Sequence, residues 1–122
     1  MNARKLALMA ATMAMAVTAA GCTGTPPPTT PQNRTFSTNE FEYSFSLKTM
    51  EVNQNDNVTI TVTNNGTMTH DFSIDTYNVH LTMNVGDTKT ASFTATTKGT
   101  FEYYCAVPGH KQLGMVGTLK VN

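Results

Sequence analysis

Hydrophobic and polar residues alternate along most of the chain after residue 35, in short runs with a period of two. The clearest run holds Val58, Ile60 and Val62, which alternate with threonines. Similar runs begin near residues 41, 72, 89, 101 and 116, and turn-forming Asn, Gly or Pro separate many of them. Because a period of two places every second side chain on one face of a strand, this pattern predicts short β-strands, each with one buried face.

Strands at this spacing, with abundant Thr and no helical pattern between them, are typical of a β-sandwich. We therefore predict an all-β fold, a Greek-key antiparallel β-sandwich, over residues 36–122. A domain of this size has a modest core, and only one of the two cysteines lies within it, so no disulfide can form inside it. A bound metal would add stability to such a domain.

The N-terminal part of the chain has a different composition. Arg4 and Lys5 precede an apolar run that is shorter than a membrane span, and small residues then lead to Cys22. This layout predicts a secretory signal peptide over residues 1–21. Cys22 stands where a lipobox places the cysteine that receives a lipid. A plain cleavage near Gly21 and, less favoured, a retained membrane helix are the alternatives. Residues 22–35, rich in Pro and Thr, are interpreted as a linker.

The charge of the chain argues against one class of partner. Without the two basic residues of the signal peptide, six basic residues remain against eight acidic ones, and they form no basic stripe. Nucleic acid is therefore not an expected partner. We expect an exported, monomeric protein. It would be anchored by a lipid on Cys22 to the outer face of the cytoplasmic membrane, or would lie in the periplasm.

The segment 101–119 carries the residues that indicate chemistry. Cys105 ends one alternating run, His110 and Met115 follow it, and His70 heads another run far upstream. A Cys thiolate with two imidazoles forms a trigonal copper site, and a thioether can add a weak axial contact. Four protein ligands leave no open position for a substrate, so this pattern favours electron transfer over catalysis.

The same residues resemble the cupredoxins, the family of plastocyanin and azurin. The run CAVPGHKQLGM, residues 105–115, resembles their ligand loop, and NNGTMTHDF, residues 64–72, resembles their first ligand strand. The resemblance implies one type 1 (blue) copper per chain, with the ligands His70, Cys105, His110 and Met115. Four residues separate successive ligands of the loop, which is a longer spacing than in plastocyanin and is similar to the rusticyanin and auracyanin groups.

Several neighbouring residues have ordinary roles that stay open. Asp71 stands where plastocyanin and azurin carry an Asn that ties the ligand strand to the cysteine loop. Whether Asp71 forms the same tie is open at the level of the sequence. Met68 and Met83 either fill gaps in the packing or receive Cu(I) transiently as soft ligands. His80 has no partner at a ligand spacing and is interpreted as a surface histidine.

By resemblance, the protein would carry single electrons through the edge of His110, surrounded by an apolar patch of Val107, Pro108, Leu113 and Met68. Its redox partner would be a cytochrome, an oxidase or a reductase. Two other functions stay open: copper binding and delivery to an oxidase or another copper enzyme, and a structural surface lipoprotein without metal. An enzyme is not expected, because a multicopper oxidase needs more than three histidines and a binuclear copper centre needs two cysteines in the loop.

Overall fold

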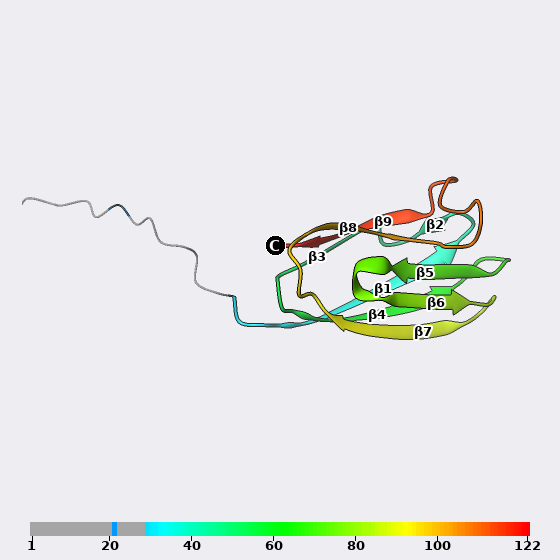
Figure 1. Ribbon diagram of the computed structural model, residues 1–122. Helices are drawn as coiled ribbons and strands as arrows, with labels where there is room; N and C mark the ends of the chain where they lie inside the picture. Colours follow the sequence, from blue (N-terminus) through cyan, green and yellow to red (C-terminus); the bar gives the residue numbers. More distant parts are fainter. Residues whose placement is uncertain (1–20, 22–28) are drawn as a thin grey trace, which may run out of the picture.

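The computed structural model describes residue 21 and residues 29–122 of the chain (Figure 1). The predicted signal peptide, the lipid site at Cys22 and the first part of the predicted linker lie outside the described residues. Among the residues that are described, no helix is long and apolar enough to cross a membrane.

In the part of the chain that the structure describes, strands account for nearly all of the regular structure, and one short 3-10 helix, η1, interrupts them. In chain order the elements are β1 (Asn33–Phe41), β2 (Ser44–Phe45), β3 (Thr49–Val52), β4 (Asn57–Asn64), β5 (His70–Ile74), η1 (Asp75–Tyr77), β6 (Val79–Met83), β7 (Thr88–Thr94), β8 (Gly99–Tyr104) and β9 (Val116–Val121).

The strands form two sheets that pack face to face. One sheet has the order β2-β1-β4-β7 and the other the order β3-β9-β8-β5-β6. The predicted β-sandwich is therefore confirmed. The sheets are mixed rather than purely antiparallel, since β1 pairs in parallel with β4, and β3 in parallel with β9. The parallel pair β1–β4 arises because the chain crosses to the other sheet for β3 before it returns for β4.

Alternation along the strands decides which side chains fill the space between the sheets. In β4, Val58, Ile60 and Val62 are buried, as the period of two predicts. An aromatic cluster of Phe45, Phe72 and Tyr103 joins the sheets, with ring centroids 5.3–5.6 Å apart. Burying each large apolar side chain contributes about 1.5–3 kcal/mol, so this core is the main source of stability.

The outer face of the four-stranded sheet carries rows of uncharged polar side chains. Hydroxyl groups of facing residues on β4 and β7 lie 3.0–3.3 Å apart, in the pairs Thr59–Ser92, Thr61–Thr90 and Thr63–Thr88. Such cross-strand pairs stabilise a sheet and help to fix its register. The register of β4 matters for the site, because β4 leads into the loop that ends at His70.

Three details differ from the sequence prediction. Tyr43 has a φ of 67°, so the run expected through Phe45 is broken into β1 and β2, and Phe41 faces solvent. Strand β6, which pairs with β5, was not predicted, because its run is short and follows a turn at Asn78 with a φ of 52°. Strand β1 begins at Asn33, three residues before the domain boundary that composition indicates.

The connections β4–β5, β6–β7 and β8–β9 lie at one end of the sandwich, and the chain enters from residue 29 at the opposite end (Figure 1). The loop from β8 to β9 contains residues 105–115, and the connection from β4 to β5 ends at His70. The topology therefore brings the predicted ligands, far apart in sequence, to the same end of the fold.

Candidate metal centre

The loop that precedes His70 is held by the buried side chain of Asn64. Its amide nitrogen donates to the carbonyl oxygens of Met68 and Met83, each at 2.9 Å. Its amide oxygen accepts a hydrogen bond from the backbone of Gly66, also at 2.9 Å. One side chain thus satisfies two backbone groups of the loop and joins the loop to the end of β6, and this fixes the point at which β5 begins with His70.

The loop from Cys105 to Met115 is closed by its own backbone. The amide of Cys105 donates to the carbonyl of Met115 at 3.1 Å, and the amide of Met115 donates to the carbonyl of His110 at 3.1 Å. Gly109 and Gly114 have φ values of 87° and 99°, a region that glycine enters without strain. These bonds and turns fold His110 back toward Cys105.

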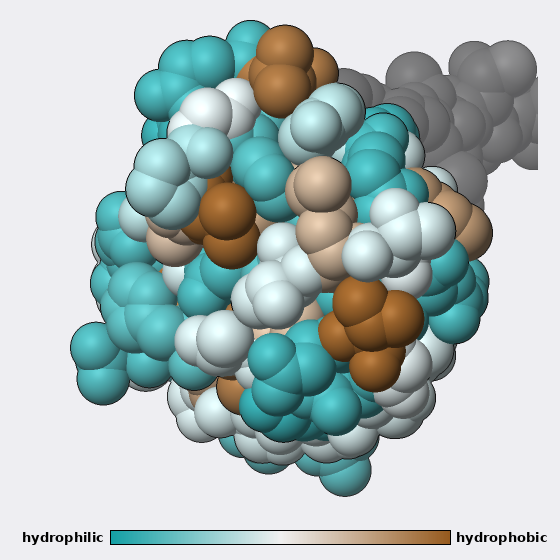
Figure 2. Space-filling view, turned by 90° about the vertical axis from the view of Figure 1, so that its right-hand side faces the viewer, coloured by the Kyte–Doolittle hydropathy of each residue, from teal (hydrophilic) through white to brown (hydrophobic). Residues whose placement is uncertain are grey.

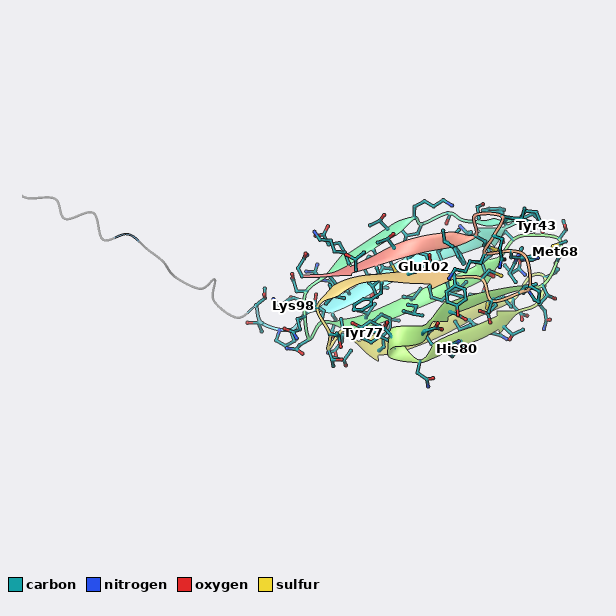
Figure 3. The ribbon with its side chains drawn as sticks, turned by 45° about the horizontal axis from the view of Figure 1, so that its top comes forward. Tyr43, Met68, Tyr77, His80, Lys98 and Glu102 are labelled. Atoms are coloured by element: carbon teal, nitrogen blue, oxygen red, sulfur yellow. The ribbon has the colours of Figure 1, made fainter. Side chains whose placement is uncertain are left out.

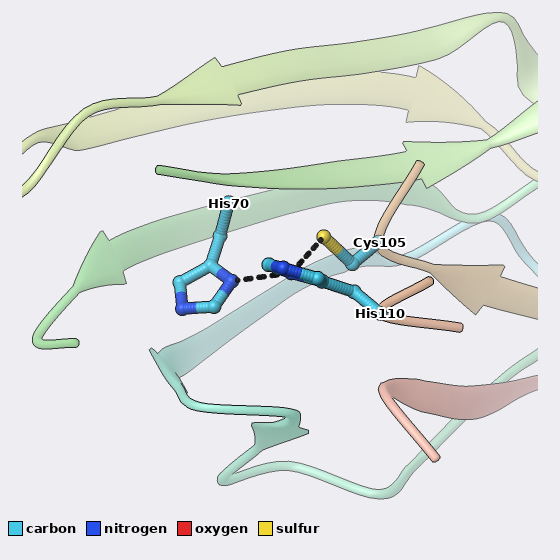
Figure 4. Close-up of side chains that lie close together, drawn as sticks. All are labelled: His70, Cys105 and His110. Carbon is cyan, nitrogen blue, oxygen red and sulfur yellow. Dashed lines mark hydrogen bonds between the residues drawn. The ribbon is translucent and has the colours of Figure 1, made fainter. Parts of the chain in front are cut away.

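The side chains of His70, Cys105 and His110 converge between the loops (Figure 4). The two Nδ1 atoms of His70 and His110 lie 3.2 Å apart, and Nδ1 of His110 lies 3.5 Å from Sγ of Cys105. The potential ligand atoms all lie within 4.8 Å of one another. His70 and Cys105 are completely buried, and His110 is 8% exposed.

This donor set fits copper. A buried thiol and two imidazole nitrogens that face one another are the His₂Cys combination typical of blue copper sites. Burial raises the pKa of the Cys105 thiol, and hydrogen bonds from the backbone amides of Val107 and Asp71 oppose this effect in part. Burial, followed by the neighbouring His110, lowers the pKa of His70. Copper binding would therefore release the proton of the Cys105 thiol, whereas the imidazole of His70 is already neutral and has no charge to lose.

Met115, the fourth predicted ligand, is completely buried at the end of the same loop. Its backbone joins it to both Cys105 and His110. The position of Met115 is thus compatible with the predicted axial contact, and the bond from its thioether stays a prediction.

Asp71 performs the tie between β5 and the cysteine loop that the sequence left open. Its amide donates to Sγ of Cys105 at 3.3 Å, and its Oδ1 accepts the amide of Ala106 at 3.3 Å. The hydroxyl of Ser73 donates to the same oxygen, and Nδ1 of His80 lies 3.1 Å from that hydroxyl. His80 itself is exposed on β6 and outside the metal group, in agreement with its interpretation as a surface histidine.

Sequence reasoning missed three residues near the site. Glu40 is completely buried and neither carboxyl oxygen has a hydrogen-bond partner, so burial, with a smaller contribution from Asp71, raises its pKa to about 7. Oε1 of Glu42 lies 3.6 Å from Nε2 of His70. The ring of Tyr43 meets His110 edge-on, with centroids 5.0 Å apart. Of the three, only Glu40 could have been found from the sequence, because it lies two residues after Thr38 on the face of β1 that alternation turns toward the core.

The two methionines with open roles lie in different surroundings. Met83 is completely buried in the core, which supports its packing role. Met68 is exposed at the same end of the sandwich as Tyr43, while Lys98 lies at the opposite end (Figure 3). Of the two, only Met68 is exposed to solvent at the end of the sandwich that carries the candidate metal centre, which we call the metal end.

The sequence of the chain matches the family model of the cupredoxin-like domain over residues 5–118. The chain therefore belongs to the cupredoxin-like family. No curated protein matches its sequence significantly.

Solved structures with a similar fold include two auracyanins. The reduced auracyanin of Roseiflexus castenholzii is 20% identical over 72% of this chain and 96% of its own, with a TM-score of 0.64. Auracyanin A of Chloroflexus aurantiacus, a blue copper protein, is 24% identical over 74% of this chain and 99% of its own, with a TM-score of 0.63. The copper nitrite reductase of Nitrosomonas europaea is similar over 74% of this chain and 41% of its own, at 21% identity and a TM-score of 0.64. At these identities the likeness is one of fold.

Proposed function

We propose that the protein carries single electrons through one type 1 copper held by His70, Cys105 and His110, with Met115 as the axial ligand. The observation that carries the proposal is the convergence of two buried imidazole nitrogens and a buried thiol at one end of a cupredoxin-like fold. Bound copper would supply the one-electron couple between Cu(II) and Cu(I).

The residues of the chain would hold this couple in a rigid setting. Asn64 fixes the loop before His70, and Asp71 ties β5 to the loop after Cys105. Because both oxidation states would use the same ligands in the same positions, little rearrangement accompanies electron transfer. With Met115 as the fourth ligand, protein groups would fill every position around the metal, and this supports a carrier rather than an enzyme.

The surface around the metal end suits short encounters with a redox partner. Among the described residues, four large apolar side chains are more than one-third exposed, and all lie in or beside loops at this end: Phe41, Met68, Val85 and Leu113. Figure 2 shows this end with separate apolar side chains that stand among weakly polar and hydrophilic ones. The slightly exposed edge of His110 would be the exit for the electron. Small, weakly charged contacts allow the partner to leave after each transfer.

The partner and the location belong to the same proposal. We take the partner to be a cytochrome, an oxidase or a reductase, and the carrier to be a monomer. Export by residues 1–21 and a lipid on Cys22 would hold it at the outer face of the cytoplasmic membrane or in the periplasm. Mass spectrometry of the membrane fraction, compared for wild type and Cys22→Ala, tests the lipid directly.

Copper delivery is the second candidate, and the exposure of Met68 at the metal end favours it. A thioether there could receive Cu(I) as it leaves the site. Transfer of Cu(I) to a chelator would then be slower in Met68→Ala than in wild type, and Met83→Leu would serve as a matched control in the core. Equal transfer rates in all three proteins would remove this candidate.

The experiment that tests the main proposal is a titration of the copper-free protein with Cu(II), followed by visible and EPR spectroscopy. A strong thiolate-to-copper band, small copper hyperfine splitting and one copper per chain are the expected results. A colourless complex, or the spectrum of an ordinary tetragonal site, would remove the electron-carrier proposal.

A further inference from the structure

The two ring nitrogens of His70 face different groups. Nδ1 lies 3.2 Å from Nδ1 of His110 and belongs to the metal group (Figure 4). Nε2 is buried, has no hydrogen-bond partner, and lies 3.6 Å from Oε1 of Glu42. A histidine that binds a metal through one nitrogen carries its proton on the other. With Nδ1 on copper, the N–H of His70 would therefore face the carboxylate of Glu42.

The carboxylate of Glu42 is held in this place by the loop before His70. Its Oε1 accepts hydrogen bonds from the backbone amide of Thr67 at 2.5 Å and from the Thr67 hydroxyl at 3.2 Å. A partly exposed glutamate that accepts hydrogen bonds from an amide and a hydroxyl is a carboxylate at neutral pH. The side chain of Glu42 is 32% exposed, whereas that of His70 is completely buried.

Gly66 leaves the room that this contact needs. A Cβ atom at Gly66 would come within 2.6 Å of Oε1 of Glu42 and within 2.9 Å of Nε2 of His70. The carboxylate of Glu42, the imidazole of His70 and the bare backbone of Gly66 therefore meet on the side of the His70 ring that faces away from His110. Glu42 directly follows β1, Gly66 lies in the loop between β4 and β5, and His70 begins β5. The parallel pairing of β1 with β4 places the end of β1 beside the start of that loop.

We infer that Glu42 is a positioning residue for the copper ligand His70, which keeps the proton of that ring on Nε2 and favours Cu(II) over Cu(I). The inference rests on the proposed function, since it concerns the same copper site. A carboxylate that faces the outer N–H of a ligand histidine fixes the ring tautomer and raises the basicity of the ligand. Its negative charge also stabilises the more highly charged metal ion, and this lowers the reduction potential.

The test compares three variants of the full protein with wild type. Glu42→Gln removes the charge and keeps an oxygen that can accept from Nε2, while Glu42→Ala removes both. Glu51→Gln is the matched control, because Glu51 is an exposed acidic residue on β3 that bonds Lys120 and Asn122. Far-UV circular dichroism of each copper-free variant checks that it is folded.

We expect both Glu42 variants to bind Cu(II) about tenfold more weakly than wild type, which is the lower end of the effect of such partners on metal affinity. If Cu(I) affinity is unchanged, the reduction potential rises by about 59 mV for each tenfold loss. Glu51→Gln should match wild type. The inference is overturned if Glu42→Gln differs from wild type in reduction potential and Cu(II) affinity by no more than Glu51→Gln does.

A second readout does not depend on the blue site. Nitrogen-15 NMR of the His70 ring in the copper-free protein reports which nitrogen carries the proton. We expect Nε2–H in wild type and Glu42→Gln, and a mixture of tautomers in Glu42→Ala. A wild-type ring protonated on Nδ1 would contradict the inference. If copper gave no blue spectrum while the tautomers behaved as expected, the electron-carrier proposal would fail and the positioning role of Glu42 would stand.

Discussion

The backbone amide of Asp71 donates to Sγ of Cys105 at 3.3 Å, and the carboxylate of Asp71 accepts the amide of the next loop residue, Ala106. The residue that follows His70 is thus bonded both to the sulfur of Cys105 and to the backbone of the residue after it. An Asn at this position could accept the same amide through its oxygen, but it would bring no charge. With copper bound at the proposed site, the carboxylate would place a negative charge beside the thiolate of Cys105, and this charge would favour Cu(II).

Replacing Asp71 by Asn therefore separates the tie from the charge. Asp71→Asn keeps an oxygen that can accept the amide of Ala106, so we expect the reduction potential to rise by roughly 30–60 mV, which corresponds to up to a tenfold change in the ratio of Cu(II) to Cu(I) affinity. Asp71→Ala removes the acceptor as well, and we expect weaker copper binding in addition. Protein-film voltammetry measures both variants. An unchanged potential in Asp71→Asn would show that the charge has no influence.

The thiol of Cys105 is the group whose loss should change the spectrum most. In Cys105→Ala, we expect no intense visible band on addition of Cu(II), because the thiolate-to-copper transition needs the sulfur. The buried site loses one atom, so we expect the free energy of unfolding of the copper-free protein to change by only about 1 kcal/mol. His80→Ala is the control and should bind one copper with the wild-type spectrum. A blue band in Cys105→Ala would contradict the assignment.

The buried carboxyl of Glu40 predicts a pH dependence of stability. Burial raises its pKa from 4.5 to about 7, so between these values the folded protein keeps a proton that the unfolded chain has released. The free energy of unfolding should therefore fall as the pH rises from about 4.5 to about 7, by up to about 3 kcal/mol.

Urea denaturation of the copper-free protein at both ends of this pH range measures the effect. Glu40→Gln cannot ionise, so it should lose this part of the pH dependence and be more stable than wild type at neutral pH. Equal pH dependence in the two proteins would show that Glu40 ionises as freely in the fold as in the unfolded chain.

Gly117 on β9 lies against the ring of Tyr103, and an added methyl group has no room there. A Cβ atom at Gly117 would come within 2.1 Å of a ring carbon. The ring cannot move aside easily, because it is completely buried and its hydroxyl donates to the carbonyl of Leu47 at 2.5 Å. We expect Gly117→Ala to lower the free energy of unfolding by about 3 kcal/mol. Chemical denaturation checks this, with the exposed Thr100→Ala as control, and wild-type stability in Gly117→Ala would contradict it.

The residues that the sequence could predict are those whose position follows from local pattern. Alternation placed His70 at the start of a strand and Cys105 at the end of one, and the spacing to His110 followed from the loop. The structure brings these three side chains together. The same pattern identified the buried face of β4, because each inward residue there is apolar.

Glu42 and Tyr43 could not be predicted, because their place depends on pairing between distant segments. Strand β1 pairs with β4 in parallel, and this pairing brings the end of β1 beside the loop that precedes His70. The φ of 67° at Tyr43 then turns the chain toward the site, and no residue preference indicates such an angle for a tyrosine. Strand alternation alone assigned both residues to an ordinary strand.

The direction of β1 places Asn33 and the candidate metal centre at opposite ends of the sandwich. The strand begins at Asn33, where the chain enters, and runs to Phe41 at the metal end, a length of about 26 Å for its nine residues. An electrode that held the chain at Asn33 would therefore lie at the opposite end of the sandwich from the candidate metal centre. Because electron tunnelling weakens steeply with distance, copper bound at that centre would exchange electrons slowly with such an electrode and faster with a soluble protein that reaches the other end.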